Sequence, residues 1–114
     1  MITLWHNPRC SKSRQALALL EDAGADITIR RYLEDAPSAD EIGQVRKLMG
    51  NPPVIQMMRT GEAVFKELGL SKTSDEPDLI AAMAAHPILI ERPVAIKGNR
   101  AVIGRPPENI RDLL

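Results

Sequence analysis

"ITLWHNPRCSKSRQALALLEDAGADITIR", residues 2–30, contains a complete strand–helix–strand pattern. "ITLW" (2–5) is a short apolar run typical of a buried strand. From Ser11 onward apolar residues recur at helical spacing, and Gly24 is a stop signal for that helix. "DITIRRY" (26–32) then alternates isoleucine with polar residues, which indicates a second strand. A helix that joins two strands within about thirty residues predicts a parallel βαβ unit.

The middle of the chain is predicted to be helical. Ser38 and Glu41 have the spacing of a capping box, which marks a helix start, and an apolar helical face follows them. Weaker helical patterns and one stronger pattern come later, at 54–58, 62–68 and 75–85. We therefore expect a helical insert at about 36–86.

The end of the chain returns to strand periodicity. "VAIK" (94–97) and "AVIG" (101–104) flank the turn sequence Gly98-Asn99-Arg100, which predicts a hairpin. "RPPENIRDLL" (105–114) begins with prolines suited to a first helical turn. The order is β-α-β, a helical insert, then β-β-α. This is the plan of an α/β thioredoxin-like fold with a mixed four-stranded sheet, predicted here as one domain over 1–114.

Composition limits the classes of function. Lys+Arg and Asp+Glu both number 15, so no basic excess favours binding of nucleic acid or of an anionic membrane surface. One cysteine and two histidines supply neither a disulfide nor a zinc-ligand pattern, and no metal is expected. The sequence shows no basic leader with an apolar core and no membrane-spanning run. A cytoplasmic protein with a reduced thiol is expected.

Cys10 is the candidate for chemistry. A lone cysteine is commonly a small buried apolar residue, but the neighbours of this one indicate another role. It follows the Asn7-Pro8 turn and lies at or just before a helix N-terminus, where backbone amides and the helix dipole favour a thiolate. Arg9, Lys12 and Arg14 add positive charge nearby.

Spacing separates the possible thiol chemistries. Because position 13 is serine, the pattern is C-x-x-S and not the C-x-x-C of a dithiol oxidoreductase, so a second thiol must come from another molecule. The phosphatase loop C-x-x-x-x-x-R requires arginine where this chain has Ala16. A tyrosine-phosphatase-like loop is therefore excluded.

The motif around Cys10 resembles that of a known family. "HNPRCSKSRQAL" (6–17) is similar to the H-N-P-x-C-x-x-S-R active-site stretch of glutaredoxin-coupled arsenate reductases. Three further blocks match the same family in order and cover nearly the whole chain: "RTGE…FKELGL" (59–70), "HPILIERP" (86–93) and "GRPPENIRDLL" (104–114).

The resemblance implies a set of site residues. Cys10 would be the nucleophile, and Arg59, Arg92 and Arg105 would hold the arsenate oxyanion with fork-shaped, permanently charged donors. It also implies a cis peptide bond between Arg92 and Pro93, directly before the third strand.

The supporting residues follow from the same motif. The Ser13 hydroxyl is expected to hydrogen-bond the Cys10 thiolate, and His6 to orient or tune the site. His86, before Pro87, is expected to be structural.

The implied reaction uses glutathione as co-substrate and glutaredoxin as partner, with no bound cofactor. Cys10 would attack arsenate, glutathione would attack the adduct, and glutaredoxin would clear the resulting mixed disulfide. Two alternatives remain open: an Spx-type redox-sensing regulator that binds RNA polymerase, and a general glutathione-dependent thiol reductase. Ser13 counts against the regulator, because such sensors commonly carry C-x-x-C.

Overall fold

The computed structural model describes residues 1–114, which form two compact units. One combines Met1–Asp35 with Arg92–Leu114, and the other is Ala36–Glu91. The second unit ends later than the predicted insert of about 36–86, because the η2 helix (Pro87–Leu89) and the pairing of Met58 with Ile90 belong to it. That both units form a single domain stays a prediction.

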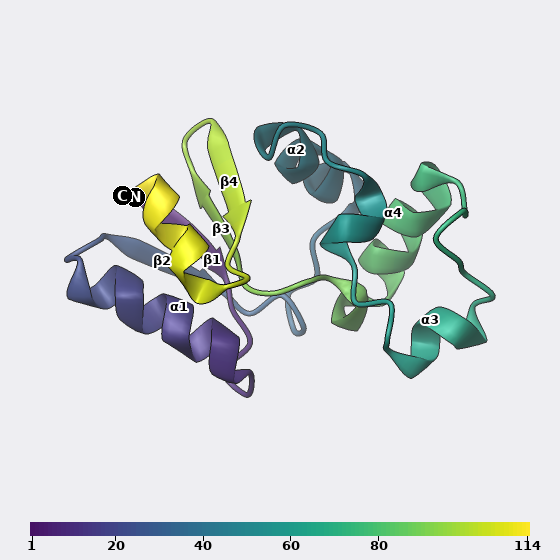
Figure 1. The fold of residues 1–114 in the computed structure, drawn as a ribbon, viewed down its shortest axis with the longest axis horizontal. Helices are drawn as coiled ribbons and strands as arrows, with labels where there is room; N and C mark the ends of the chain where they lie inside the picture. Colours follow the sequence, from purple (N-terminus) through teal and green to yellow (C-terminus); the bar gives the residue numbers. More distant parts are fainter. The chain divides into compact units, whose positions relative to one another are not determined.

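A four-stranded sheet organises the first unit (Figure 1). Its strands are β1 (Ile2–Trp5), β2 (Ile27–Arg30), β3 (Val94–Lys97) and β4 (Arg100–Ile103). They lie in the order β2-β1-β3-β4, with β1 parallel to β2 and antiparallel to β3, and with β3 antiparallel to β4. The mixed thioredoxin-like sheet predicted from the sequence is confirmed.

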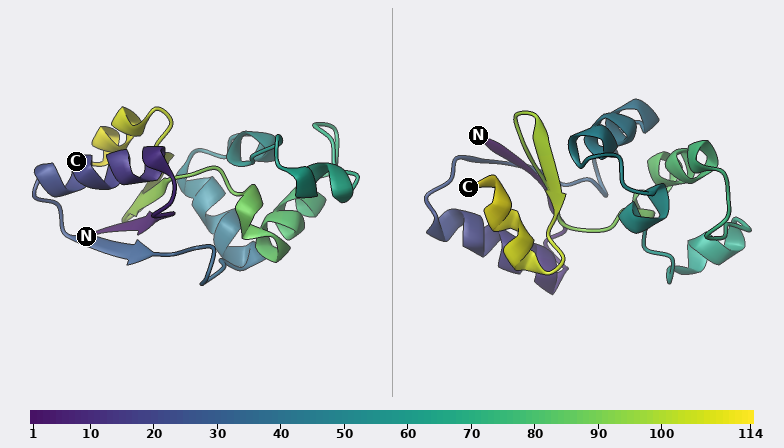
Figure 2. Two further views of the ribbon diagram at one scale, coloured as in Figure 1. Left: turned by 90° about the horizontal axis from the view of Figure 1, so that it is seen from below. Right: turned by 45° about the horizontal axis from the view of Figure 1, so that its top comes forward.

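Two helices cover one face of this sheet (Figures 1 and 2). They are α1 (Ser11–Asp22) and η3 (Pro107–Leu113), which contact each other. The predicted C-terminal helix is present as a 3₁₀-helix. The core beneath them consists of Ile2, Leu4, Ala16, Leu20, Ala95, Ile110 and Leu113.

The predicted hairpin joins β3 to β4 through two residues rather than three. Lys97 pairs with Arg100, so Arg100 belongs to β4 and only Gly98 and Asn99 form the turn. Gly98 has φ 57°. Positive φ at the first turn position is the requirement of a type II′ turn, which glycine meets without strain.

The second unit is entirely helical. It contains α2 (Ala39–Leu48), η1 (Val54–Met57), α3 (Ala63–Glu67) and α4 (Glu76–Ala85), followed by η2. α4 packs against α2, η1 and η2. All of the helical segments predicted for this region are therefore present.

The start of α2 confirms the capping box. The Glu41 N–H donates to Ser38 Oγ at 3.1 Å, and the Ser38 N–H donates to Glu41 Oε1 at 3.1 Å. Two backbone donors that the helix itself leaves unpaired are satisfied in this way.

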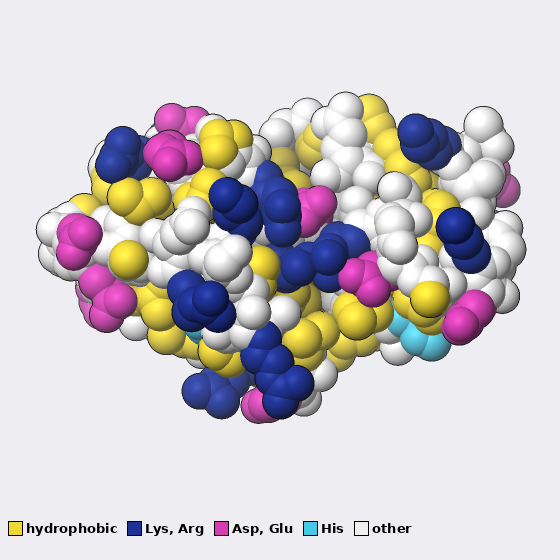
Figure 3. Space-filling view, turned by 60° about the horizontal axis from the view of Figure 1, so that its bottom comes forward, with side chains coloured by type: hydrophobic (Ala, Val, Ile, Leu, Met, Phe, Trp, Pro, Cys, Tyr) yellow, Lys and Arg dark blue, Asp and Glu magenta, His cyan; other side chains and the backbone are white.

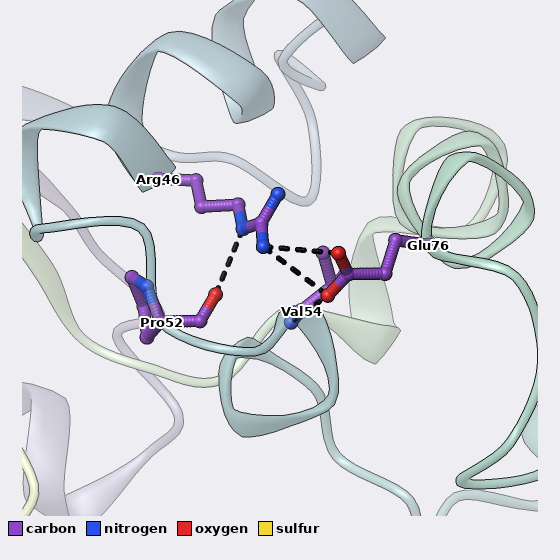
Figure 4. A network of polar contacts seen from close by, with 4 residues as sticks. All are labelled: Arg46, Pro52, Val54 and Glu76. Atoms are coloured by element: carbon purple, nitrogen blue, oxygen red, sulfur yellow. Dashed lines mark hydrogen bonds and ion pairs between the residues drawn. The ribbon is translucent and has the colours of Figure 1, made fainter.

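A polar network ties the end of α2 to the start of α4 (Figure 4). Arg46 Nε donates to the Pro52 carbonyl at 2.8 Å, and its Nη2 lies 3.1 and 3.2 Å from the Glu76 carboxylate oxygens. Glu76 Oε2 also accepts from the Val54 N–H at 3.1 Å. One ion pair thus fixes the connection between α2 and η1 against α4.

Side chains of both charges occur on the molecular face drawn in Figure 3, in keeping with the equal numbers of basic and acidic residues. No helix in the structure is long and apolar enough to cross a membrane.

We expect Arg46→Met to lower the free energy of unfolding by about 1 kcal/mol and the Tm by about 4 °C, because it removes the guanidinium but keeps the apolar stem. Thermal melts measure the effect. Lys47→Met, an exposed change on the same helix turn, is the matched control and should leave the Tm nearly unchanged. Equal Tm values for both variants would show that the network contributes no stability.

Candidate active site

The loop between β1 and α1 is folded around the backbone and side chain of Asn7. The Asn7 carbonyl accepts from the Cys10 N–H at 3.0 Å, and Asn7 Oδ1 accepts from the Arg9 N–H at 3.0 Å. Arg14 Nη1 reaches back to donate to the Pro8 carbonyl at 2.9 Å. These bonds set Cys10 as the extended N-cap residue of α1, with φ −95° and ψ 124°.

Cys10 combines burial with a stabilised negative charge. The residue is only 7% exposed, and this burial raises the pKa of its thiol. The backbone N–H of Ser13, the charge of Arg92, the backbone N–H of Lys12 and a hydrogen bond from the Arg92 side chain lower that pKa. The lowering effects prevail, so the pKa of Cys10 lies below its ordinary value and the thiolate is favoured.

Ser13 acts on Cys10 through its backbone and not through its hydroxyl. Ser13 Oγ lies 2.6 Å from His6 Nδ1 and accepts from the Asn7 N–H at 3.0 Å. The predicted hydrogen bond from this hydroxyl to the thiolate is therefore wrong, because a fully buried Ser13 side chain is directed toward His6.

His6 is a buried partner of Ser13. Burial, then the positive charges of Arg31 and Arg14, lower the pKa of His6. A lowered pKa favours the neutral imidazole at pH 7, whose Nδ1 is then available to pair with the hydroxyl of Ser13. His6 therefore orients the first turn of α1 and adds no positive charge to the site.

Two of the predicted arginines lie in the first unit. The Arg92-Pro93 peptide bond is cis, as predicted, and Arg105-Pro106 is a second cis bond. Arg105 Nε donates to the Arg92 carbonyl at 3.1 Å, so the two arginines are in contact. At Gly104, which directly precedes Arg105, an added Cβ would lie 2.8 Å from Cγ of Pro93, which directly follows Arg92. Glycine is needed there for the two loops to approach.

Arg59, the third predicted arginine, lies in the helical unit. Its side chain forms an ion pair with Glu62, and its N–H donates to the Leu89 carbonyl at 2.8 Å. His86 is the C-cap residue of α4, where its backbone N–H donates to the Ala82 carbonyl at 2.8 Å, and the structural role of its side chain stays a prediction. Convergence of Arg59 with the other two arginines stays a prediction.

Sequence reasoning missed the loop after β2. Arg31 and Glu34, in that loop, line a cavity together with the His6–Arg9 stretch. The parallel pairing of β1 with β2 was the available signal, because the carboxyl ends of parallel strands meet at one edge of a sheet and commonly hold ligands there. No group of three or more His, Cys, Asp or Glu side chains is placed to hold a metal ion.

The fold and this site define a class: a thioredoxin-like protein with one free cysteine at the first helix N-terminus and a cis-proline before β3. Within that class the chain belongs to the ArsC family, whose model matches residues 5–113.

Relatives match over almost the full chain. An arsenate reductase of Haemophilus influenzae is 42% identical over 114 residues, which cover 99% of this chain and 98% of the relative. The solved structure of an arsenate reductase from Vibrio cholerae is 43% identical, with a TM-score of 0.94 and coverage of 99% and 97%. That of a putative arsenate reductase from Yersinia pestis is 42% identical, with a TM-score of 0.91 and coverage of 98% and 99%.

The lowered pKa of Cys10 predicts alkylation by iodoacetamide with a midpoint below the free-cysteine value of about 8.5. Arg92→Ala should raise that midpoint, because it removes a positive charge and a hydrogen bond from the thiolate. The measurement is the alkylation rate against pH, scaled to its plateau. Arg111→Ala, an exposed change on η3, is the control, and a midpoint that moves equally in both variants would contradict the role of Arg92.

Ser13→Ala tests which part of Ser13 matters. The change leaves His6 Nδ1 and the Asn7 N–H without the buried hydroxyl, so we expect about 2 kcal/mol of lost stability in denaturant melts. The alkylation midpoint of Cys10 should move little, because the backbone N–H of residue 13 is kept. Ser11→Ala, exposed on the same turn, should change neither quantity. A large midpoint shift without destabilisation would restore the hydroxyl-to-thiolate interaction.

Proposed function

We propose that this protein is an arsenate reductase that takes its electrons from glutathione and is regenerated by glutaredoxin in the cytoplasm. The observation that carries the proposal is the favoured Cys10 thiolate with Arg92 acting on its sulfur. Membership of the ArsC family and the names of the Haemophilus influenzae and Vibrio cholerae relatives support arsenate as the substrate.

Arsenate is held by arginines while the thiolate attacks it. Arg92 acts on the Cys10 sulfur, and Arg105 donates to the Arg92 carbonyl; these two arginines, with Arg59 as the third, are proposed to hold the arsenate. Cys10 Sγ attacks arsenic(V), a sulfur–arsenic bond forms, and one arsenate oxygen leaves as water after protonation. The positive charges favour this step because they stabilise the arsenate oxyanion as it approaches the negatively charged sulfur.

Reduction of arsenic requires a second thiol. The glutathione thiolate attacks Cys10 Sγ in the adduct, the sulfur–sulfur bond forms, and the sulfur–arsenic bond breaks with its electron pair remaining on arsenic. Arsenic(V) gains two electrons and leaves as arsenite, while the two thiol sulfurs lose one electron each and become a disulfide. Glutaredoxin then exchanges its own thiol with this mixed disulfide and frees Cys10.

The single cysteine supports an external electron donor. Position 13, where a dithiol enzyme carries its resolving cysteine, holds a serine whose hydroxyl is bound to His6. No internal disulfide is available to this chain, so each turnover must use thiols from other molecules.

Cys10→Ser should abolish arsenate reduction while the Tm stays within a few degrees, because no other residue forms the thiol adduct. The assay is arsenate-dependent NADPH oxidation with glutathione, glutaredoxin and glutathione reductase, with arsenite measured directly in parallel. Omitting glutaredoxin should slow turnover of the unaltered protein. Substantial arsenite production by the serine variant would disprove the mechanism, and production without glutathione would disprove the electron donor.

The arginines should act on the anion and leave the fold intact. Arg→Ala at position 59, 92 or 105 is expected to reduce kcat/KM for arsenate by about thirtyfold, which corresponds to about 2 kcal/mol. Arg→Lys should recover only part of that loss, because it keeps the charge but not the bidentate fork.

Two readouts separate the arginines from one another. Arg92→Ala should lower kcat/KM and also raise the alkylation midpoint of Cys10, whereas the changes at Arg59 and Arg105 should lower kcat/KM alone. Thermal melts and the exposed Arg111→Ala variant are the controls. Wild-type kinetics in all three alanine variants would show that the substrate is not an oxyanion held by these residues.

A further inference from the structure

A cavity lies beside the Cys10 loop, at the carboxyl ends of the parallel strands β1 and β2. Its volume is about 240 Å³. The two segments that form it follow directly from the ends of the strands, and the first of them leads into Cys10. The lining residues are His6, Asn7, Pro8 and Arg9 from one segment, and Arg31, Leu33 and Glu34 from the other.

The charged groups of this cavity have no partners within the protein. Arg9 and Arg31 are exposed, and neither side chain forms a salt bridge or a side-chain hydrogen bond. The Glu34 carboxylate is also unpaired, since only its backbone N–H is bonded, to the Arg31 carbonyl at 3.0 Å. Two cations and one anion are thus available to a ligand in this cavity, and one of them, Arg9, directly precedes Cys10.

We propose that this cavity binds the carboxylate-bearing end of the thiol that attacks the Cys10 adduct. The ligand class is a small peptide thiol with two carboxylates and one ammonium group, which is the charge pattern of glutathione. Arg9 and Arg31 receive the carboxylates, and Glu34 receives the ammonium group. The identity of this thiol as the arsenate reductant rests on the function proposed above.

The size and position of the cavity fit one end of such a molecule. Its volume is smaller than that of most pockets for whole drug-sized ligands, so it holds an arm of the peptide rather than all of it. Arg9, which lines the cavity, directly precedes Cys10 in the chain, so the proposed subsite lies on the loop that carries the sulfur. The half-exposed Leu33 provides an apolar wall for the peptide backbone.

The test uses a reaction at Cys10 that needs no arsenate. The Cys10 thiolate attacks one sulfur of glutathione disulfide, the disulfide bond breaks, and glutathione thiolate leaves as the protein–glutathione mixed disulfide forms. Mass spectrometry follows the rate. Hydroxyethyl disulfide, which is neutral, is the matched probe because it undergoes the same exchange without carboxylates.

We expect Arg9→Ala and Arg31→Ala each to slow the reaction with glutathione disulfide about fivefold, the upper range for an exposed ion pair. Glu34→Gln should slow it less, and 0.5 M salt should reduce all of these differences. The rate with hydroxyethyl disulfide should stay unchanged in every variant. Arg111→Ala, an exposed arginine far along the chain, should react like the unaltered protein with both probes.

Equal rates with glutathione disulfide in the unaltered protein and in both arginine variants would overturn the proposal. An equal loss of rate with glutathione disulfide and with hydroxyethyl disulfide would also overturn it. In that case the substitution would act on the Cys10 thiolate and not on the charge of the ligand. The arsenate assay separates the two proposals. If the protein reduces arsenate but its exchange with glutathione disulfide does not depend on these charges, the cavity proposal alone is refuted. If the exchange depends on these charges but the protein does not reduce arsenate, the cavity proposal is supported and the proposed function is refuted.

Discussion

Stabilisation of negative charge on a buried sulfur is the constraint on which the site depends. Burial alone would keep Cys10 protonated, so the charge requires the backbone N–H groups of α1 and the guanidinium of Arg92 together. These groups come from opposite ends of the chain. The pairing of Trp5 with Val94 in antiparallel strands brings them together, because the loop that leaves β1 and the segment that enters β3 then lie at the same edge of the sheet.

The same edge collects the other loops of the first unit. Val94 pairs with Ile103, so the Gly104-Arg105 segment leaves β4 beside the cis-proline, and a side chain at position 104 would not fit there. β2 runs parallel to β1, so Arg31 leaves its strand in the same direction as the Cys10 loop. One strand order therefore places the thiolate, two arginines and the charged cavity at one end of one sheet.

Local signals were sufficient for much of this arrangement. The apolar periods located the strands and helices, the Ser38 capping box located the start of α2, and the place of Cys10 at a helix N-terminus indicated an activated thiol. The charge that lowers the pKa of Cys10 is that of Arg92, and not the charges of Arg9, Lys12 and Arg14 that the local sequence suggested. The direction of the Ser13 hydroxyl was not predictable, because it depends on the tertiary position of His6. The cavity residue Arg31 was also missed, although the predicted parallel pairing of the first two strands implied that the loops after them meet at one edge of the sheet.

Ser13 has two roles in the first turn of α1, one carried by its backbone and the other by its side chain. Its backbone N–H belongs to the set that stabilises the thiolate, and any residue except proline supplies it. Its hydroxyl, fully buried, joins His6 to the Asn7 N–H and so holds the loop that makes Cys10 the N-cap. The turn therefore supplies Cys10 with backbone N–H groups but with no second thiol, so in the proposed reaction the mixed disulfide is resolved by a thiol from another molecule.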